Sequence, residues 1–205
     1  MTMTLREGKR KAFEAFGIPE DGGDSEAWVD FKLGPLPMPF PNSDARRRAV
    51  KLHDLHHVLT GYRMDIVGEF EISAWEIAAG CGAYVVPWYL NLMGVTAGML
   101  TAPRRTARAF WRGARARSLY TSLGHDAVID RSIEDVQGEL GIAPSAEPRV
   151  RDVAALAGSA LAGAVLSLLT AAIVLTPVTL IAWAISYRAY QRARANRVVR
   201  DQHVA

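Results

Sequence analysis

The sequence lacks the residues and motifs of several common functional classes. Cys81 is the only cysteine in 205 residues, which excludes an internal disulfide framework and a cysteine-based zinc knot, and we expect its thiol to be buried. Glycine-rich phosphate loops and dinucleotide-binding fingerprints are absent. Residues 1–17 contain neither the apolar run nor the small-residue cleavage site of a secretory signal, so we expect any membrane segment to stay in the mature chain.

Charged residues are missing from two long stretches of the chain. The first, Cys81 to Leu100, is long enough to cross a bilayer, but it contains Pro87, Asn91 and three glycines. We therefore expect it to line the core or a pocket of a compact helical bundle. The second, Val153 to Tyr187, would form a helix about 52 Å long at 1.5 Å per residue, whereas a hydrocarbon core is about 30 Å thick. The second stretch must therefore bend or leave the bilayer.

A break in this second stretch is expected at Thr176-Pro177, where a cap residue precedes a proline suited to a first helical position. The Gly- and Ala-rich residues 157–164 are the alternative. We predict a bent or re-entrant apolar hairpin over residues 151–190, on the cytoplasmic side of the cell inner membrane, and a basic tail over 191–205. Small residues that would let helices approach closely in lipid are Ala154, Gly158, Ser159 and Gly163. A hairpin buried in a soluble protein is the other interpretation.

Positive charge is concentrated in two groups, although the formal net charge is only +3. The groups are Arg104, Arg105, Arg108, Arg112, Arg115 and Arg117, and Arg188, Arg192, Arg194, Arg197 and Arg200. In the first group, four residues at helical spacing are expected on one side of a helix: Arg104, Arg108, Arg112 and Arg115. We expect these four to bind anionic membrane lipids rather than nucleic acid. A solvated helix face is the alternative.

The rest of the chain predicts an all-α fold, a helical bundle, because no strand-like alternation occurs. Helices are expected over residues 5–16, 44–60, 65–79 and 126–140, each followed by a glycine, and an arginine-rich helix begins near residue 103. Prolines at positions 35, 37, 39 and 41 predict an extended segment, because alternating prolines cannot join a helix or a central strand. Residues 1–150 would form one helical metal-binding domain.

A candidate metal site lies in the second and third of these helices. His53, Asp54 and His57 share one side of the helix over 44–60, opposite its leucines. Two histidines at positions i and i+4 can hold one cation between their ring nitrogens, and Asp54 adds an oxygen. A reversal after Thr60 can bring Glu69 against them. We therefore predict a divalent metal bound by His53, Asp54, His57 and Glu69, with a solvated polar helix face as the alternative.

Two more polar residues accompany this set. Glu76 follows Glu69 by seven residues and shares its helix face. We expect Glu76 to be the catalytic residue, as a carboxylate that orients a ligating histidine or carries a proton, rather than a fifth ligand. An exposed carboxylate is the alternative. His56 points between the two faces of its helix and is expected outside the metal site.

Other histidine motifs fail on the residues they require. "HDLHH" also reads as the HxxHH pattern of membrane di-iron hydroxylases and desaturases, but five histidines are too few for that centre. The zinc-protease pattern HExxH needs a glutamate where Asp54 stands. The HD phosphohydrolase pattern needs a histidine upstream of His53, and there is none.

The pattern HDxxH, eleven residues and Glu, made by His53, Asp54, His57 and Glu69, resembles the signature of the coenzyme Q (ubiquinone) biosynthesis protein four family. The segment "SLYTSLGHDAVIDRSIEDVQGELGI" is similar to the closing helix of that family. The similarity covers about Leu36 to Ile142. The apolar hairpin from residue 153 departs from it.

The resemblance implies an α-helical, membrane-associated metalloprotein that binds a prenylated benzoquinone precursor. Its activity would be oxidative decarboxylation and hydroxylation at ring carbon C1, with zinc, iron or manganese as the metal. A different function is a non-catalytic prenylquinone-binding scaffold that gathers other ubiquinone-biosynthesis enzymes around a structural metal, and a metal-dependent lipid hydrolase is a third. A homodimer is compatible with each, and no nucleic-acid partner is expected.

Overall fold

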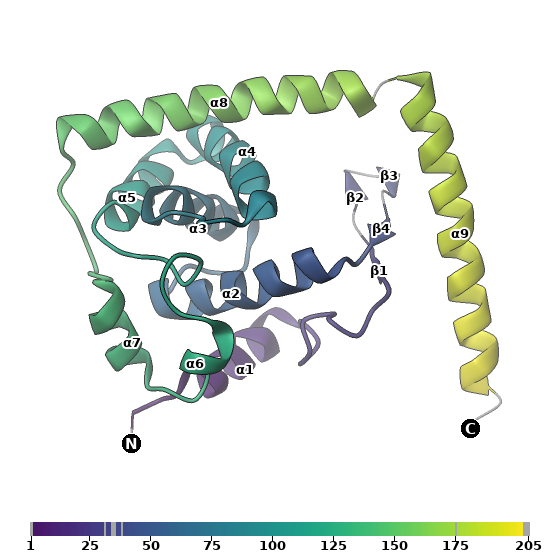
Figure 1. Cartoon of the computed structure of the whole chain (residues 1–205), viewed down its shortest axis with the longest axis horizontal. Coiled ribbons are helices and arrows are strands. Elements are labelled where there is room, and N and C mark those ends of the chain that lie inside the picture. Colours follow the sequence, from purple (N-terminus) through teal and green to yellow (C-terminus); the bar gives the residue numbers. More distant parts are fainter. Residues whose placement is uncertain (1, 31, 34–35, 38, 175, 203–205) are drawn as a thin grey trace. The chain divides into compact units, whose positions relative to one another are not determined.

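The computed structural model describes residues 2–30, 32–33, 36–37, 39–174 and 176–202. This part of the chain is mostly helical, which confirms the all-α prediction (Figure 1). Its helices are α1 (Leu5–Phe16), α2 (Asp44–Thr60), α3 (Ile66–Ala79), α4 (Val85–Thr101), α5 (Pro103–Gly113), α6 (His125–Val128), α7 (Ile133–Leu140), α8 (Val150–Val174) and α9 (Pro177–Gln202). Two short antiparallel ladders pair β1 (Trp28–Val29) with β4 (Phe40–Pro41) and β2 (Lys32–Leu33) with β3 (Leu36–Pro37).

The chain divides into two compact units. One comprises residues 1–22 and 44–168, and the other comprises residues 23–43 and 169–205. The first unit holds α1 to α7 and most of α8, together with every candidate site residue. α9 continues without a break through residue 190, so the predicted hairpin and basic tail share one helix. Residues 203–205 of the predicted tail lie outside the described residues.

The ends of the predicted helices over 44–60 and 65–79 are confirmed, because local signals set them. Gly61 adopts a left-handed φ of 75° and its N–H bonds the carbonyl of His57, which ends α2. The Asp65 carboxylate then accepts a hydrogen bond from the Gly68 N–H at 2.9 Å and caps α3. This short reversal sets the faces of α2 and α3 that carry the candidate ligands against each other.

The core of the first unit is built around α3, which packs against α4 and α5. Trp75 and Ile72 of α3 and Leu55 and Leu59 of α2 are fully buried. Gly113 at the end of α5 lies so close to α3 that a Cβ atom there would be 2.3 Å from the Trp75 carbonyl oxygen. α5 ends at this glycine, so the prediction that Arg115 shares a helix face with Arg104, Arg108 and Arg112 is wrong: Arg115 lies beyond the end of that helix.

The prediction of one helix over residues 126–140 is wrong, because the chain forms α6 and α7 there. The interruption pairs with the start of α1: the Arg6 N–H bonds the Ile129 carbonyl and the Leu5 N–H bonds the Arg131 carbonyl. α7 then begins at Ser132, whose hydroxyl accepts from the Asp135 N–H at 3.1 Å. The hydrogen bonds between α1 and the interruption replace the helical hydrogen bonds that a continuous helix over 126–140 would have made.

The two uncharged stretches adopt different roles. The first forms α4, which packs on α3 and lines a pocket, as predicted. The second breaks at the predicted place, since α8 ends at Val174 and α9 begins at Pro177. The Thr176 hydroxyl accepts from the Thr179 N–H at 3.3 Å. Among the described residues, α8 is the one helix long and apolar enough to cross a membrane, with a mean hydropathy of 2.0.

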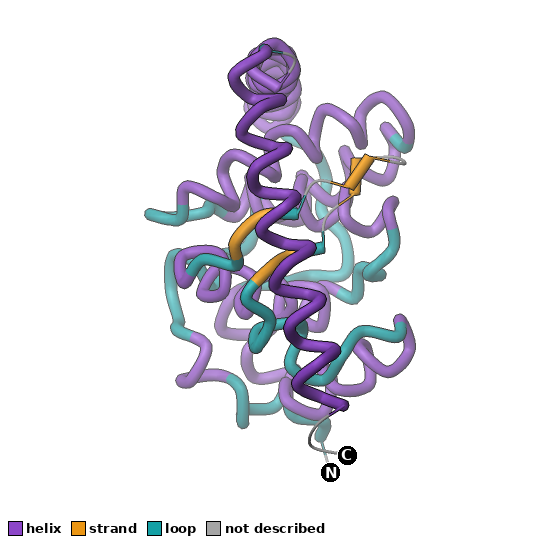
Figure 2. The backbone as a smooth tube through the Cα atoms, turned by 90° about the vertical axis from the view of Figure 1, so that its right-hand side faces the viewer, coloured by secondary structure: helices purple, strands orange, loops and turns teal. Residues whose placement is uncertain are grey.

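The second unit contains the proline-rich segment and α9 (Figure 2). Pro37 and Pro41 lie in two-stranded ladders, where each strand has a free edge that tolerates a residue without an N–H. The Trp183 indole of α9 donates to the Pro37 carbonyl at 2.8 Å. Trp28 packs edge-on against Tyr190. Pro35, part of the predicted extended segment, lies outside the described residues.

Candidate metal site and adjoining pocket

Three of the four predicted metal ligands lie together between α2 and α3. The Nε2 atoms of His53 and His57 are 3.2 Å apart, and each is 3.3 Å from one carboxylate oxygen of Glu69. One ligand atom from each of the three residues falls within a group no wider than 4.8 Å. The group could therefore hold a metal ion.

The hydrogen bonds of the two imidazoles fit a cation at this point. His57 Nδ1 is 3.1 Å from the Tyr62 carbonyl oxygen, so this nitrogen must carry the proton that it donates. His53 Nδ1 is 3.0 Å from Glu76 Oε1 and donates in the same way. Both Nε2 lone pairs then face the Glu69 carboxylate. Two lone pairs and a carboxylate at these distances are compatible only if a cation, a metal ion or a proton, lies among them.

The electrostatics of the chain without metal agree with that conclusion. Burial disfavours the charged form of His53, but the Glu76 charge and the hydrogen bonds to Glu69 and Glu76 outweigh it and hold the pKa of His53 well above its ordinary value. Burial also raises the pKa of Glu69, yet its hydrogen bonds to His53 and His57 lower that pKa to about 2. The site therefore retains a negative carboxylate and attracts a positive charge.

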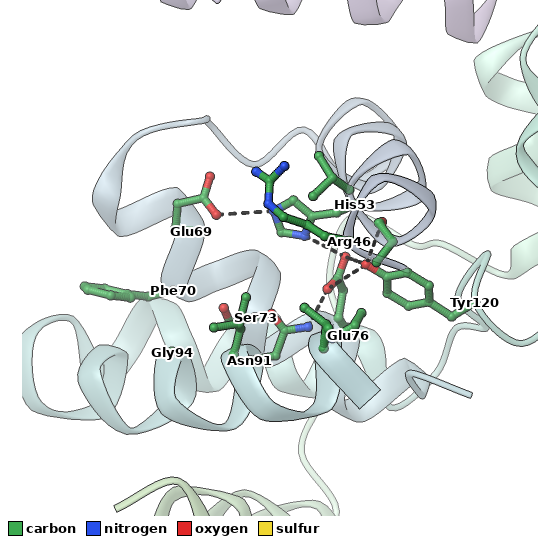
Figure 3. A pocket seen from close by; sticks show the side chains of 14 residues that line it. Arg46, His53, Glu69, Phe70, Ser73, Glu76, Asn91, Gly94 and Tyr120 are labelled. Carbon is green, nitrogen blue, oxygen red and sulfur yellow. Dashed lines mark hydrogen bonds and ion pairs between the residues drawn. The ribbon is translucent and has the colours of Figure 1, made fainter. Parts of the chain in front are cut away.

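Glu76 is the centre of a buried network behind the candidate ligands (Figure 3). It is fully buried and accepts hydrogen bonds from His53, from His56 at 2.7 Å, from the Asn91 amide and from the Tyr120 hydroxyl at 3.3 Å. Burial alone would raise the pKa of Glu76, but its partners His53 and His56 lower it well below the ordinary value. The carboxylate is thus ionised and contacts a histidine as the predicted orienting role requires. Whether it is catalytic stays a prediction.

His56 lies outside the metal group because both its ring nitrogens are engaged elsewhere. Its Nε2 accepts the Leu119 N–H at 2.8 Å, so its Nδ1 is the protonated nitrogen that donates to Glu76. The side chain is fully buried, and this burial lowers its pKa. His56 therefore supports Glu76 from inside the core.

Asp54 is not brought to the other three predicted ligands. Its Oδ2 atom is 3.3 Å from the Lys9 ammonium of α1, and both side chains are largely buried. Burial raises the pKa of Asp54, and the charge of Lys9 opposes that rise. Neighbouring residues on a helix are turned by about 100° from each other. Asp54 therefore lies between two faces of α2, the face with His53 and His57 and the face that packs against α1. Its role as a ligand stays a prediction.

A pocket of about 420 Å³ opens beside the metal group (Figure 3). Its lining includes the ionisable side chains of His53, Glu69 and Arg46. The remaining lining includes Ala49, Val50, Phe70, Ser73, Glu76, Val86, Pro87, Leu90, Asn91, Gly94 and Tyr120. The sequence does not predict the contribution of Tyr120 or of Arg46, because neither belongs to a spaced motif and each reaches the pocket only through the fold.

Two of the four arginines expected to bind lipid are used inside the protein. Arg112 donates to the carbonyl oxygens of Thr60 and Ala143, and Arg115 forms an ion pair with Asp152 of α8. Arg104 and Arg108 of α5 are exposed and form no hydrogen bond or ion pair with any residue that the structure describes. The helix face available for lipid is therefore smaller than predicted.

No family model, no curated protein and no solved structure matches the chain. The resemblance to the coenzyme Q biosynthesis protein four family therefore rests on the residue pattern alone. The geometry adds an independent observation: two imidazoles and one carboxylate make a three-ligand set, and sets of this size leave coordination positions for a substrate. His53 and Glu69 line the pocket as well, so such positions are accessible from it.

Proposed function

We propose that the chain is a metal-dependent, membrane-associated enzyme of ubiquinone or related prenylquinone biosynthesis. The observation that carries the proposal is the convergence of His53 Nε2, His57 Nε2 and Glu69, because His53 and Glu69 also line a pocket whose other walls are largely apolar. A bound metal would polarise an oxygen of the substrate, and iron or manganese, unlike zinc, would also support oxidation. A site with open positions favours chemistry over a purely structural metal.

The pocket residues match the two halves of such a substrate. Arg46 and the metal group supply positive charge for a ring carboxylate or phenolate, while Phe70, Pro87 and Leu90 supply apolar contact for the ring and the start of a prenyl tail. Glu76 keeps His53 oriented, because it holds the proton on Nδ1 and leaves Nε2 free to bind. These roles use only side chains that line or adjoin the pocket.

Following the family resemblance, the proposed reaction replaces the ring carboxyl group at C1 by hydroxyl. A ring carboxylic acid and water give a phenol, carbon dioxide, two protons and two electrons, so an electron acceptor is required. We propose dioxygen as that acceptor, which takes up the two electrons and two protons to give hydrogen peroxide, and this redox step requires iron or manganese in the site. A zinc-loaded site would leave this reaction without a redox centre.

Turnover by the purified, full-length protein tests the proposal. The protein would be loaded separately with iron, manganese and zinc and given a prenylated 4-hydroxybenzoate in detergent under air, with product followed by mass spectrometry. We expect decarboxylated, hydroxylated product with iron or manganese, none with Glu69→Gln, and unchanged turnover with His125→Ala, whose histidine lies outside the site. Bound lipid and metal without product would support the scaffold instead. Absence of metal binding would overturn both.

A further inference from the structure

The first half of α8 is bound to the metal-binding unit, beginning at its first turn. Asp152 is 4% exposed and forms an ion pair with Arg115, two residues beyond the end of α5. The same carboxylate accepts the Arg149 N–H at 2.8 Å, which fixes the start of the helix. One turn later Leu156 is 6% exposed and belongs to the hydrophobic core. The helix therefore does not leave the unit at its N-terminus.

The contact continues onto α4, which α8 crosses (Figure 1). The Thr96 hydroxyl of α4 donates to the Ala160 carbonyl at 2.7 Å. At Gly163 the two backbones are so close that a Cβ atom would be 1.9 Å from the Leu92 carbonyl oxygen. Of the small residues expected to permit close helix approach, Gly163 does so, whereas a Cβ atom on Gly158 would meet no atom within 4 Å.

These contacts lie on one face of α8. Residues 152, 156, 160 and 163 are separated by four, four and three positions, the spacing of one helix stripe. Beyond residue 163 only eleven residues of the helix remain before its end at Val174. They extend about 16 Å at 1.5 Å per residue, against a hydrocarbon core of about 30 Å. The part of α8 that is free of the unit is too short to cross a bilayer.

A crossing α8 would therefore have to take α4 and α5 into the hydrocarbon with it. α5 carries Arg104, Arg105 and Arg108, all exposed, and charged side chains at bilayer depth are costly. The alternative, complete release of α8, would expose Leu156 and break the ion pair of Asp152. Both routes to a crossing helix are unfavourable.

The opposite face of α8 is apolar and uncovered. Leu161, Val165 and Leu168 are 66%, 48% and 72% exposed, and their spacing places them together. α8 crosses α4 at Leu92 and Thr96. Trp88 and Leu100 lie on the same face of α4, on either side of this crossing, and both are exposed. The apolar surface thus extends from α8 onto both ends of α4.

We propose that α8 lies in the plane of the membrane, with one face on α4 and its face of Leu161, Val165 and Leu168 in the acyl region of a single leaflet. Lipid is the fitting partner because the face has no polar group to pair with a protein surface, and exposed Arg149 and Arg151 at its start suit anionic headgroups. This arrangement leaves both ends of α8 on one side of the membrane. It does not depend on the chemistry of the metal site.

Depth measurements along the helix test this proposal in the full-length protein. In a Cys81→Ala background, single cysteines at 160, 161, 164, 165, 167 and 168 would carry an environment-sensitive fluorophore. The protein would be bound to vesicles of phosphatidylcholine and phosphatidylglycerol and quenched by lipids brominated at defined depths. We expect strong quenching at 161, 165 and 168 and weak quenching at 160, 164 and 167. A quenching profile that changes steadily with residue number, or no vesicle binding, would overturn the proposal.

A matched glycine pair tests whether docking on α4 holds the helix in this orientation. Gly163→Val introduces a side chain where the Leu92 carbonyl lies, whereas Gly158→Val enters open space on the same helix. We expect Gly163→Val to abolish the alternating quenching pattern and Gly158→Val to preserve it. Equal behaviour of the two variants would show that docking on α4 is not what orients α8. The wild-type scan keeps its meaning even if Gly163→Val does not fold.

Discussion

His53 and His57 direct their Nε2 atoms at each other across 3.2 Å, and both Nδ1 atoms are already hydrogen-bonded, to Glu76 and to the Tyr62 carbonyl. An arrangement of this kind has its ligating lone pairs in place before a metal arrives. Little side-chain ordering then remains to oppose metal binding. The site should therefore bind a metal ion with little rearrangement of these two side chains.

Removal of any one of the three gathered ligands should empty the metal site. We expect His53→Ala, His57→Ala and Glu69→Gln to lose nearly all bound metal, because two remaining ligands cannot hold a divalent ion against water. Elemental analysis of folded protein after size exclusion measures this. His125→Ala serves as the control, since His56 is a core residue whose loss would disturb the fold. Full metal content in Glu69→Gln would refute the ligand set.

Glu76→Gln should weaken metal binding without abolishing it. The amide keeps the shape of the side chain but removes the charge that holds the Nδ1 proton of His53, and changes of this kind typically cost about 10- to 100-fold in affinity. Competition with a chromophoric chelator gives the affinity. Glu71→Gln is a matched control, because Glu71 lies on the same helix and pairs with Arg105 outside the site. Equal effects of the two changes would remove the orienting role.

The sequence predicts that Asp54 is a metal ligand, whereas the structure places it in an ion pair with Lys9, and the two roles predict different effects of a substitution. As a ligand, Asp54 would be needed for metal, whereas its pair with Lys9 would make it a link between α1 and α2. Because its oxygens are outside the gathered ligand atoms, we expect Asp54→Asn to keep its metal and to lower the free energy of unfolding. A double-mutant cycle with Lys9→Met should give a coupling of about 1 kcal/mol. Loss of metal in Asp54→Asn would restore the ligand assignment.

The sequence predicts those parts of the fold and site that depend on local rules. Helix periodicity predicts that His53 and His57 share one face of α2. Gly61 ends α2 and Asp65 caps α3, and the short reversal between them brings Glu69 close to the two histidines. The sequence could not predict contacts between segments that are far apart along the chain. Tyr120 reaches Glu76 from a segment 44 residues away, and the division of the helix over 126–140 depends on hydrogen bonds from the start of α1.

The exposed arginines of α5 should contribute to membrane binding in a salt-dependent way. We expect the double change Arg104→Ala and Arg108→Ala to weaken binding to vesicles containing phosphatidylglycerol by about 1 kcal/mol per arginine at low ionic strength. The difference should shrink at high salt, because surface charges are screened. Flotation of the full-length protein measures both. The same double change at Arg10 and Lys11 of α1 is the control, and an equal loss there would indicate a non-specific charge effect.

Ser73 should contribute to ligand recognition in the pocket. The residue is 7% exposed, lines the pocket one turn after Glu69, and its hydroxyl makes no hydrogen bond to any residue that the structure describes. A hydroxyl at the pocket wall can exchange a bond to water for a bond to a ligand oxygen, which is typically worth about 1 kcal/mol. We therefore expect Ser73→Ala to weaken binding of 4-hydroxybenzoate roughly fivefold while leaving metal content unchanged.

Benzoate provides the comparison that isolates this hydrogen bond. It keeps the ring and the carboxylate of 4-hydroxybenzoate but lacks the phenolic oxygen, so its affinity should be the same for the wild type and for Ser73→Ala. Gly94→Ala offers a second change at the same place, because a Cβ atom there would be 2.3 Å from the Ser73 hydroxyl oxygen and would displace it. Calorimetric titration of both ligands into the metal-loaded protein gives the affinities. An equal loss for benzoate would mean that Ser73 shapes the pocket without binding the ring oxygen.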